Sequence, residues 1–186
     1  TISGGTFGGT VTNLLNAVIS GGIFMKQVQN NGIISGGMFY GGINGGTIRG
    51  NTVTFMKNGS RYALEVVADG NKVVAPMEPA AVEGRKFTGW YTDEALTEEY
   101  EFGSTLPESI TLYAGFGPVT YTVEYVGGAE FGLCSDVKTH GEDLTLRGET
   151  FTKDGYVQTG WVDKETGAVY KLGDTYTENA DVTLNL

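Results

Sequence analysis

One cysteine and one histidine are the side chains of this sequence best suited to nucleophilic chemistry. His140 follows Cys134 closely, in a stretch of small and polar residues with no evident orienting partner. A cysteine nucleophile is normally activated by a histidine supplied from elsewhere in the fold, with a third group holding that histidine. We therefore interpret Cys134 as a small buried apolar residue or an incidental thiol, and we predict that the chain is not an enzyme. A single cysteine also excludes an internal disulfide.

Carboxylates are the second group that could do chemistry, and five of them fall between Asp93 and Glu101. A calcium site is conceivable, but the spacing does not match the EF-hand loop, whose ligands alternate around a required glycine. No set of Cys and His has zinc-ligand spacing. We therefore predict a solvated acidic face, with no metal and no cofactor. Thr92 or Asp93 could cap a helix, so a short helix is expected from Thr92 to Tyr100.

Aromatic side chains are the third group, because exposed rings bind sugars and proteins. Trp90 and Trp161 occupy equivalent positions of a repeat, which favours core anchors over sugar-stacking platforms. Tyr91, Tyr100 and Tyr113, together with the acidic face, are candidate contacts for a sugar or a protein. The sequence does not tell which of these rings are exposed, so the ligand-binding residues stay unknown.

Charge is distributed unevenly along the chain. The formal net charge is −10, yet residues 1–51 contain no Asp or Glu and only Lys26 and Arg49 as bases. An acidic surface repels phosphate backbones, so no nucleic-acid partner is expected. No apolar run approaches the roughly 20 residues that span a bilayer, so no membrane insertion is expected either.

Glycine dominates residues 1–50, and a short motif recurs there. Ile2-Ser3-Gly4-Gly5 returns at Ile19-Ser20-Gly21-Gly22 and again at Ile34-Ser35-Gly36-Gly37, each time followed by x-Phe. Short strands joined by glycine corners and stacked period on period form a β-solenoid, so we predict about three rungs here. A disordered linker is the alternative. The first rung has no cap, so we expect further rungs upstream in a longer parent chain and self-association through the uncapped end.

Two similar modules follow the solenoid. Gly89-Trp90 recurs as Gly160-Trp161, and the flanking matches upstream and downstream keep almost the same offset. In the first module, Asn58-Gly59 between alternating apolar residues predicts a β-hairpin. The chain is thus predicted to be mainly β, with a solenoid at 1–50 and modules at 51–117 and 118–186.

The two modules resemble the Listeria–Bacteroides repeat, which is related to the B repeat of internalin-type surface proteins. The first match is carried by the segments Thr54-Phe55, Asn58-Gly59, Phe87-Thr88-Gly89-Trp90-Tyr91-Thr92-Asp93, Tyr100 and Ile110-Thr111-Leu112-Tyr113-Ala114. The second match rests on Tyr121-Thr122-Val123-Glu124-Tyr125, Phe151-Thr152-Lys153-Asp154-Gly155-Tyr156, Gly160-Trp161, Tyr170 and Ala180-Asp181-Val182-Thr183-Leu184. Val162 departs from the pattern by replacing the aromatic residue after the tryptophan.

The resemblance implies a small β-grasp-like fold, with at most one short helix in each module, and an extracellular place at the bacterial cell surface or cell wall. It brings no catalytic residue. We therefore expect a non-catalytic structural, spacer and interaction module of a secreted or wall-associated protein. The alternative is an adhesin that binds a host or bacterial surface protein or glycan through exposed aromatics of the repeats.

Overall fold

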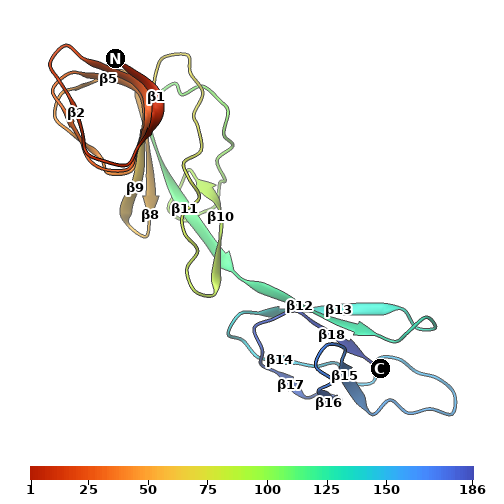
Figure 1. Ribbon diagram of the computed structural model, residues 1–186. Helices are drawn as coiled ribbons and strands as arrows, with labels where there is room; N and C mark the ends of the chain where they lie inside the picture. Colours follow the sequence, from red (N-terminus) through yellow and green to blue (C-terminus); the bar gives the residue numbers. More distant parts are fainter. The chain divides into compact units, whose positions relative to one another are not determined.

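The chain folds entirely into β-strands, turns and loops, as the computed structural model of residues 1–186 shows (Figure 1). The predicted mainly β fold is therefore confirmed, and neither module contains a helix. The strands form two compact units, residues 1–81 with 87–116 and residues 82–86 with 117–186. The solenoid and the first repeat lie in the same unit, while the boundaries predicted at residues 50 and 117 stay a prediction.

The glycine-rich residues form three stacked coils, visible as loops in red and orange in Figure 1. One wall contains β1 (Ile2–Phe7), β3 (Val18–Phe24) and β5 (Ile33–Phe39), to which the short β7 (Thr47–Ile48) adds. The other wall contains β2 (Val11–Asn13), β4 (Val28–Asn30) and β6 (Ile43–Asn44). All these strands pair in parallel, and the register places Ile19 beside Ile2 and Ile34, and Phe24 beside Phe7 and Phe39.

Aromatic stacking fills the interior of the coils. The rings of Phe7 and Phe24 are 4.9 Å apart, and those of Phe24 and Phe39 are 4.8 Å apart, with planes within 9° of parallel. Glycine is required where the rungs approach most closely, because a Cβ on Gly21 would lie 2.5 Å from the Ser3 carbonyl oxygen. The recurring Gly-Gly pair is therefore a condition of rung-on-rung stacking.

An asparagine ladder at one corner also ties the rungs together. Asn13 Nδ2 donates to Asn30 Oδ1 at 2.8 Å, and the same oxygen accepts the backbone N–H of Gly32 at 3.2 Å. Asn30 Nδ2 donates in turn to the Gly45 carbonyl at 3.2 Å. Both asparagines are buried, so these bonds satisfy polar groups that have no access to water. The ladder was not predicted from the sequence, although Asn13 and Asn30 occupy the same position in successive rungs.

The first repeat continues the solenoid sheet. Its strands are β8 (Asn51–Lys57), β9 (Ser60–Val67), β10 (Arg85–Tyr91) and β11 (Ile110–Pro118), and the order across the sheet is β1-β3-β5-β9-β8-β11-β10. The predicted hairpin at Asn58-Gly59 is confirmed, with φ of 50° and 73° at the two turn residues. β9 pairs antiparallel with β5 and so closes the downstream end of the solenoid.

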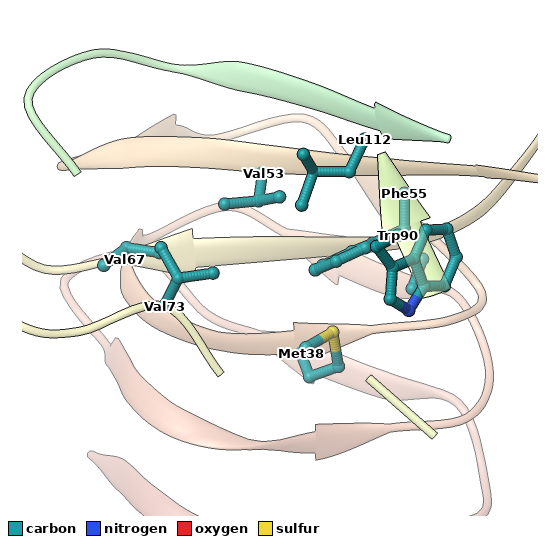
Figure 2. Packing of buried hydrophobic residues seen from close by; sticks show 8 residues of the cluster. Met38, Val53, Phe55, Val67, Val73, Trp90 and Leu112 are labelled. Carbon is teal, nitrogen blue, oxygen red and sulfur yellow. The ribbon is translucent and has the colours of Figure 1, made fainter. Parts of the chain in front are cut away.

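One core lies on each side of β9. Leu64 and Val66 pack into the solenoid interior, whereas Ala63 and Val67 join the core of the repeat. Figure 2 shows the core of the repeat, in which Trp90 packs against Phe55 at 4.9 Å between ring centroids, with Val53, Leu112 and Met38 around them. In a regular strand Tyr62 and Leu64 would lie on the same face. A bulge between Phe55 and Met56 instead turns Tyr62 toward Trp90, on the opposite face from Leu64.

The helix predicted from Thr92 to Tyr100 is absent. The Asp93 carboxylate instead accepts the backbone N–H of Thr97 and of Glu98, each at 3.0 Å, and so closes a loop. Leu96 has a φ of 58°, which a helix cannot contain. The prediction was wrong because Asp side chains stabilise turns by the same backbone contacts that they make as helix caps.

The second repeat forms a separate core. Its strands are β12 (Thr120–Val126), β13 (Leu133–Thr139), β14 (Leu144–Thr145), β15 (Gly160–Asp163), β16 (Val169–Lys171), β17 (Thr175–Tyr176) and β18 (Val182–Asn185). The main sheet has the order β13-β12-β18-β15-β16, and β14 pairs with β17. Trp161 packs against Tyr125 at 4.7 Å between ring centroids, as Trp90 packs against Phe55 in the first repeat.

A buried acid interrupts the apolar core of the first repeat. Glu65 lies on β9 between Ala63 and Val67, and both carboxyl oxygens lie within 3.2 Å of the Val74 backbone N–H. Burial raises the pKa of Glu65 to about 7, and the hydrogen bond from Val74 offsets only part of that rise. Folding therefore favours the protonated form of Glu65, relative to the same carboxyl in the unfolded chain.

Replacing Asn30 by Ala should lower the free energy of unfolding by about 2–4 kcal/mol, because the Gly32 N–H and the Gly45 carbonyl would lose their buried partner. Urea denaturation measures this change. Asn44→Ala is the matched control, because exposed Asn44 bonds only the Gln29 side chain and should change stability by less than about 0.5 kcal/mol. Equal effects of the two substitutions would show that the ladder does not stabilise the solenoid.

Glu65→Gln should make stability less dependent on pH. The unfolded carboxyl has a pKa of 4.5 and the folded one about 7, so the folded state binds the extra proton between these values and loses stability as pH rises through them. At pH 8 the Gln variant should be more stable than the parent by about 1–3 kcal/mol, and at pH 4 the two should be equal. Urea denaturation at both pH values checks this, and an equal difference at pH 4 and pH 8 would contradict it.

Candidate functional site

Cys134 and His140 do not form a catalytic pair. Cys134 is half-buried on β13 and packs against the core of the second repeat. β13 is extended up to Thr139, and a strand rises about 3.3 Å per residue, so roughly 17 Å separate the Cys134 and Thr139 backbones. His140 Nδ1 lies 2.7 Å from the Tyr121 hydroxyl instead. Cys134 and His140 are close in the sequence, but the extended strand between them keeps their side chains apart.

Both tryptophans are core residues. Trp90 is 3% exposed and Trp161 is fully buried, so neither ring offers a face to a sugar. The Trp161 indole Nε1–H donates to the Arg147 carbonyl at 2.8 Å, which satisfies its only polar group. The prediction that these residues anchor the cores is confirmed.

Arg147 orders the polar side of the second core. Its guanidinium binds the Asp136 carboxylate at 2.6 Å and lies over the Tyr125 ring at 5.4 Å. Hydrogen bonding from Arg147 holds the pKa of Asp136 below its usual value, while burial raises the pKa of Tyr125 to about 12. These contacts are internal to the second repeat and stabilise its fold.

The three candidate tyrosines are only half-exposed. Tyr91 lies against Gly115 with its hydroxyl 3.4 Å from Thr88 Oγ1, and Tyr100 stacks edge-on against Phe102 in the first core. Burial, with a smaller contribution from the nearby Glu65 carboxylate, raises the pKa of Tyr100. Tyr91 and Tyr100 therefore serve mainly in packing.

Tyr113 is the candidate that lines a hollow. It shares a cavity of about 350 Å³ with Asn58 and Gly59 of the hairpin turn and with Glu94 and Leu96 of the acidic loop. A tyrosine ring beside a side-chain amide and a carboxylate is a combination that suits a sugar, because the ring stacks and the polar groups accept or donate hydrogen bonds. This hollow brings one of the predicted aromatic contacts together with the acidic segment.

The remaining acids near Asp93 do not converge. Asp93 is committed to the backbone of its own loop, Glu98 accepts the Thr92 hydroxyl at 3.0 Å, and no three Asp, Glu, His or Cys side chains in the structure are grouped to hold a metal ion. Burial raises the pKa of Asp93, but the hydrogen bonds from the backbone and hydroxyl groups of this loop together outweigh it, so the pKa lies below its usual value. The acidic segment is a self-supporting loop.

A larger groove was not foreseen from the sequence. It has a volume of about 620 Å³ and lies between the Gly-Gly ladder of the solenoid and the strap of residues 71–77. The strap is fixed at Val74 by Glu65 and at Met77, whose backbone N–H donates to the Tyr40 hydroxyl at 2.6 Å. The walls of the groove come from residues as distant in the sequence as Gly4 and Met77, so no local pattern in the sequence could have indicated the groove.

The second repeat has a hollow of its own, of about 470 Å³. It is lined by Tyr170 and Tyr176 and by five carboxylates from Glu124, Asp163, Glu165, Glu178 and Asp181. Asp163 binds the Thr166 hydroxyl at 2.6 Å and the backbone N–H of Glu165 at 2.8 Å, and these bonds lower its pKa. The hydrogen bonds of Asp163 are thus internal to the turn after β15.

Comparison with known proteins supports the assignment of two repeats. The Listeria-Bacteroides repeat domain matches residues 52–115 and 119–185, and residues 1–51 lie outside both matches. No solved structure matches the chain. None of the chain forms a helix of the length and apolarity needed to cross a bilayer.

Three relatives are similar over much of the chain. Two come from Evansella cellulosilytica: a "Putative membrane protein", 32% identical over 67% of this chain, and a "Putative Gly-rich membrane protein", 34% identical over 72%. The third is Internalin H of Listeria monocytogenes, 32% identical over 62% of this chain. The matched region spans 20%, 15% and 21% of these relatives, respectively. Because two tandem matches of one family model cover most of the sequence, the chain belongs to the Listeria-Bacteroides repeat domain family.

Proposed function

We propose that this chain is a non-catalytic spacer within a secreted or wall-associated bacterial protein. In this role it holds other domains of that protein away from the cell envelope. The observation that carries the proposal is that the tryptophans, the usual platforms for a sugar, and the ion pair beside the second core are used internally. Both tryptophans and Phe55 are buried in the cores, and the Arg147–Asp136 pair serves the second core. A module whose large side chains pack against one another in its own core is stable without a bound ligand.

The relatives support the same role and place. They are much longer than this chain, and their names describe membrane proteins and an internalin, so a similar segment is a small part of a large envelope protein. The ordered coils add stiffness, because each rung is fixed to the next by parallel strand pairing and stacked phenylalanine rings. An extracellular location at the cell surface or cell wall belongs to this proposal.

A second candidate function is binding of a glycan or a surface protein, and the hollow at Tyr113 favours it. The hollow combines an aromatic ring, the Asn58 amide and the Glu94 carboxylate within a single unit. The second repeat does not offer the same combination, because Asn185 stands where the first repeat has Tyr113. A binding role of the Tyr113 hollow would therefore belong to the first repeat, because the hollow of the second repeat has a different lining, with Tyr170, Tyr176 and five carboxylates.

A surface-display experiment tests the spacer role. The chain is placed between a wall anchor and an epitope on a bacterial cell, and antibody access to the epitope is measured. We expect access to persist when the chain is exchanged for an unrelated rigid β-module of similar length, and to fall when it is deleted. Loss of access with the unrelated module would contradict a spacer that acts through length and stiffness.

Tyr113→Ala separates the two functions. For a spacer, the substitution should change epitope access and cell association by less than twofold, while thermal unfolding shows a loss of about 1 kcal/mol because a half-buried ring is removed. For a binder, association with cells or with a glycan panel should fall at least tenfold. Tyr113→Phe is the control, because it keeps the ring and removes only the hydroxyl. A tenfold loss in the Ala variant alone would make binding the main function.

A further inference from the structure

The second repeat buries a lysine where the first repeat has a valine. Lys138 of β13 lies opposite Tyr121 of β12, as Val67 of β9 lies opposite Asn51 of β8. Both side chains are buried, since Lys138 is 1% exposed and Val67 is 4% exposed. A valine at this position needs no polar partner, whereas a lysine carries an ammonium group into a place that water does not reach.

No carboxylate neutralises the Lys138 ammonium. Neither of the two salt bridges in the structure contains this lysine. Its Nζ donates instead to the Thr139 carbonyl at 3.3 Å and to Asn179 Oδ1 at 3.1 Å, and it lies 5.9 Å from the centre of the Tyr121 ring. Buried cations are normally paired with an acid, so this one is held at a cost to the folded state.

The side-chain carbonyl of Asn179 is polarised toward attack by an amine. Its Oδ1 accepts a second hydrogen bond, from the Gly141 backbone N–H at 2.9 Å. Two donors on one carbonyl oxygen stabilise the negative charge that forms there when a nucleophile adds to the carbon. Because a C=O bond is about 1.2 Å long, Asn179 Cγ lies within about 4.3 Å of Lys138 Nζ. An approach of at most about 1 Å therefore places the two atoms at reacting distance.

We propose that Lys138 and Asn179 form an isopeptide bond within the second repeat. Lys138 Nζ attacks Asn179 Cγ, and the Nζ–Cγ bond replaces the Cγ–Nδ2 bond. The released nitrogen takes all but one of the protons of the two side-chain nitrogens and leaves as an ammonium ion. The positive charge thus leaves the core, and a neutral amide stays. The reaction needs no further reactant and occurs once in each molecule, so a slow rate is sufficient.

The bond ties together the strands on either side of β12. β13 and β18 both pair with β12, and Asn179 lies in the segment just before β18. A covalent link between residues 138 and 179 closes the intervening chain into a loop, which lowers the entropy of the unfolded state as a disulfide does. The first repeat has no such link, because Val67 stands where the second has Lys138. This inference does not depend on the proposed spacer role.

The intact mass of the whole chain tests the bond. We expect the purified protein, after incubation at growth temperature, to be lighter than its sequence by one molecule of ammonia. Lys138→Met should restore the full mass, because it removes the amine and places an apolar side chain where the first repeat has Val67. Lys153→Met is the matched control, because exposed Lys153 pairs with Glu130 at 2.8 Å and its replacement should leave the mass deficit unchanged.

Tryptic peptides of the parent chain locate the bond. Trypsin does not cleave after a lysine whose Nζ is in an amide, so residues 87–147 should appear joined to residues 172–186. In Asn179→Ala, residues 87–138 and 139–147 should appear as separate peptides. Thermal unfolding checks that the Ala and Met variants are folded, and each should unfold at a lower temperature than the cross-linked parent.

The parent chain by itself can overturn the proposal. A full mass with separate peptides would show that Lys138 stays a free cation held by two carbonyl oxygens. A mass deficit that persists in Lys138→Met would also overturn it, because an Asn-Gly pair such as Asn58-Gly59 loses ammonia when it closes to a succinimide. The joined peptides distinguish the two sources of the deficit, since a succinimide links no distant residues.

Discussion

The antiparallel pairing of β5 with β9 is the contact on which the first unit depends. A stack of parallel rungs cannot bury its own end, because the last rung exposes the interior that every earlier rung covers. In this chain the short β7 pairs with the beginning of β5, and β9 pairs with Gly37–Phe39 of β5 and supplies the side chains Leu64 and Val66 that close the core. The same strand presents Ala63 and Val67 to the opposite side and so begins the core of the repeat. One strand thus joins two architectures into a single unit.

The sequence predicted the parts of this structure that repeat. The Ile-Ser-Gly-Gly spacing indicated the rungs, Asn58-Gly59 indicated the hairpin, and the duplicated Gly-Trp indicated the two modules and their buried anchors. Such features are local and periodic, so they can be found without knowledge of tertiary contacts. The prediction of a helix at Thr92–Tyr100 was wrong, because an aspartate accepts hydrogen bonds from nearby backbone N–H groups in a loop just as it does at a helix cap.

What the sequence did not indicate depends on contacts between distant residues. The groove between the glycine ladder and the strap of residues 71–77 joins positions as far apart in the chain as Gly4 and Met77. The burial of Glu65 depends on the segment that contains Val74, whose backbone N–H donates to the Glu65 carboxylate. The hollow at Tyr113 likewise requires the hairpin turn and the acidic loop to meet. Candidate binding surfaces of this kind follow from tertiary packing, whereas the cores follow from the pattern of each module.

The spacer role rests on order in the glycine-rich coils, since a flexible linker of the same composition would give reach without stiffness. Amide hydrogen exchange followed by mass spectrometry tests this most directly. We predict that peptides covering β3 and β5 are protected to about the same extent as those covering β8 and β9, because these strands belong to one sheet and open together. Exchange of the β1–β6 region at the rate of an unstructured chain, with protection confined to the repeats, would contradict the account and make residues 1–50 a flexible linker.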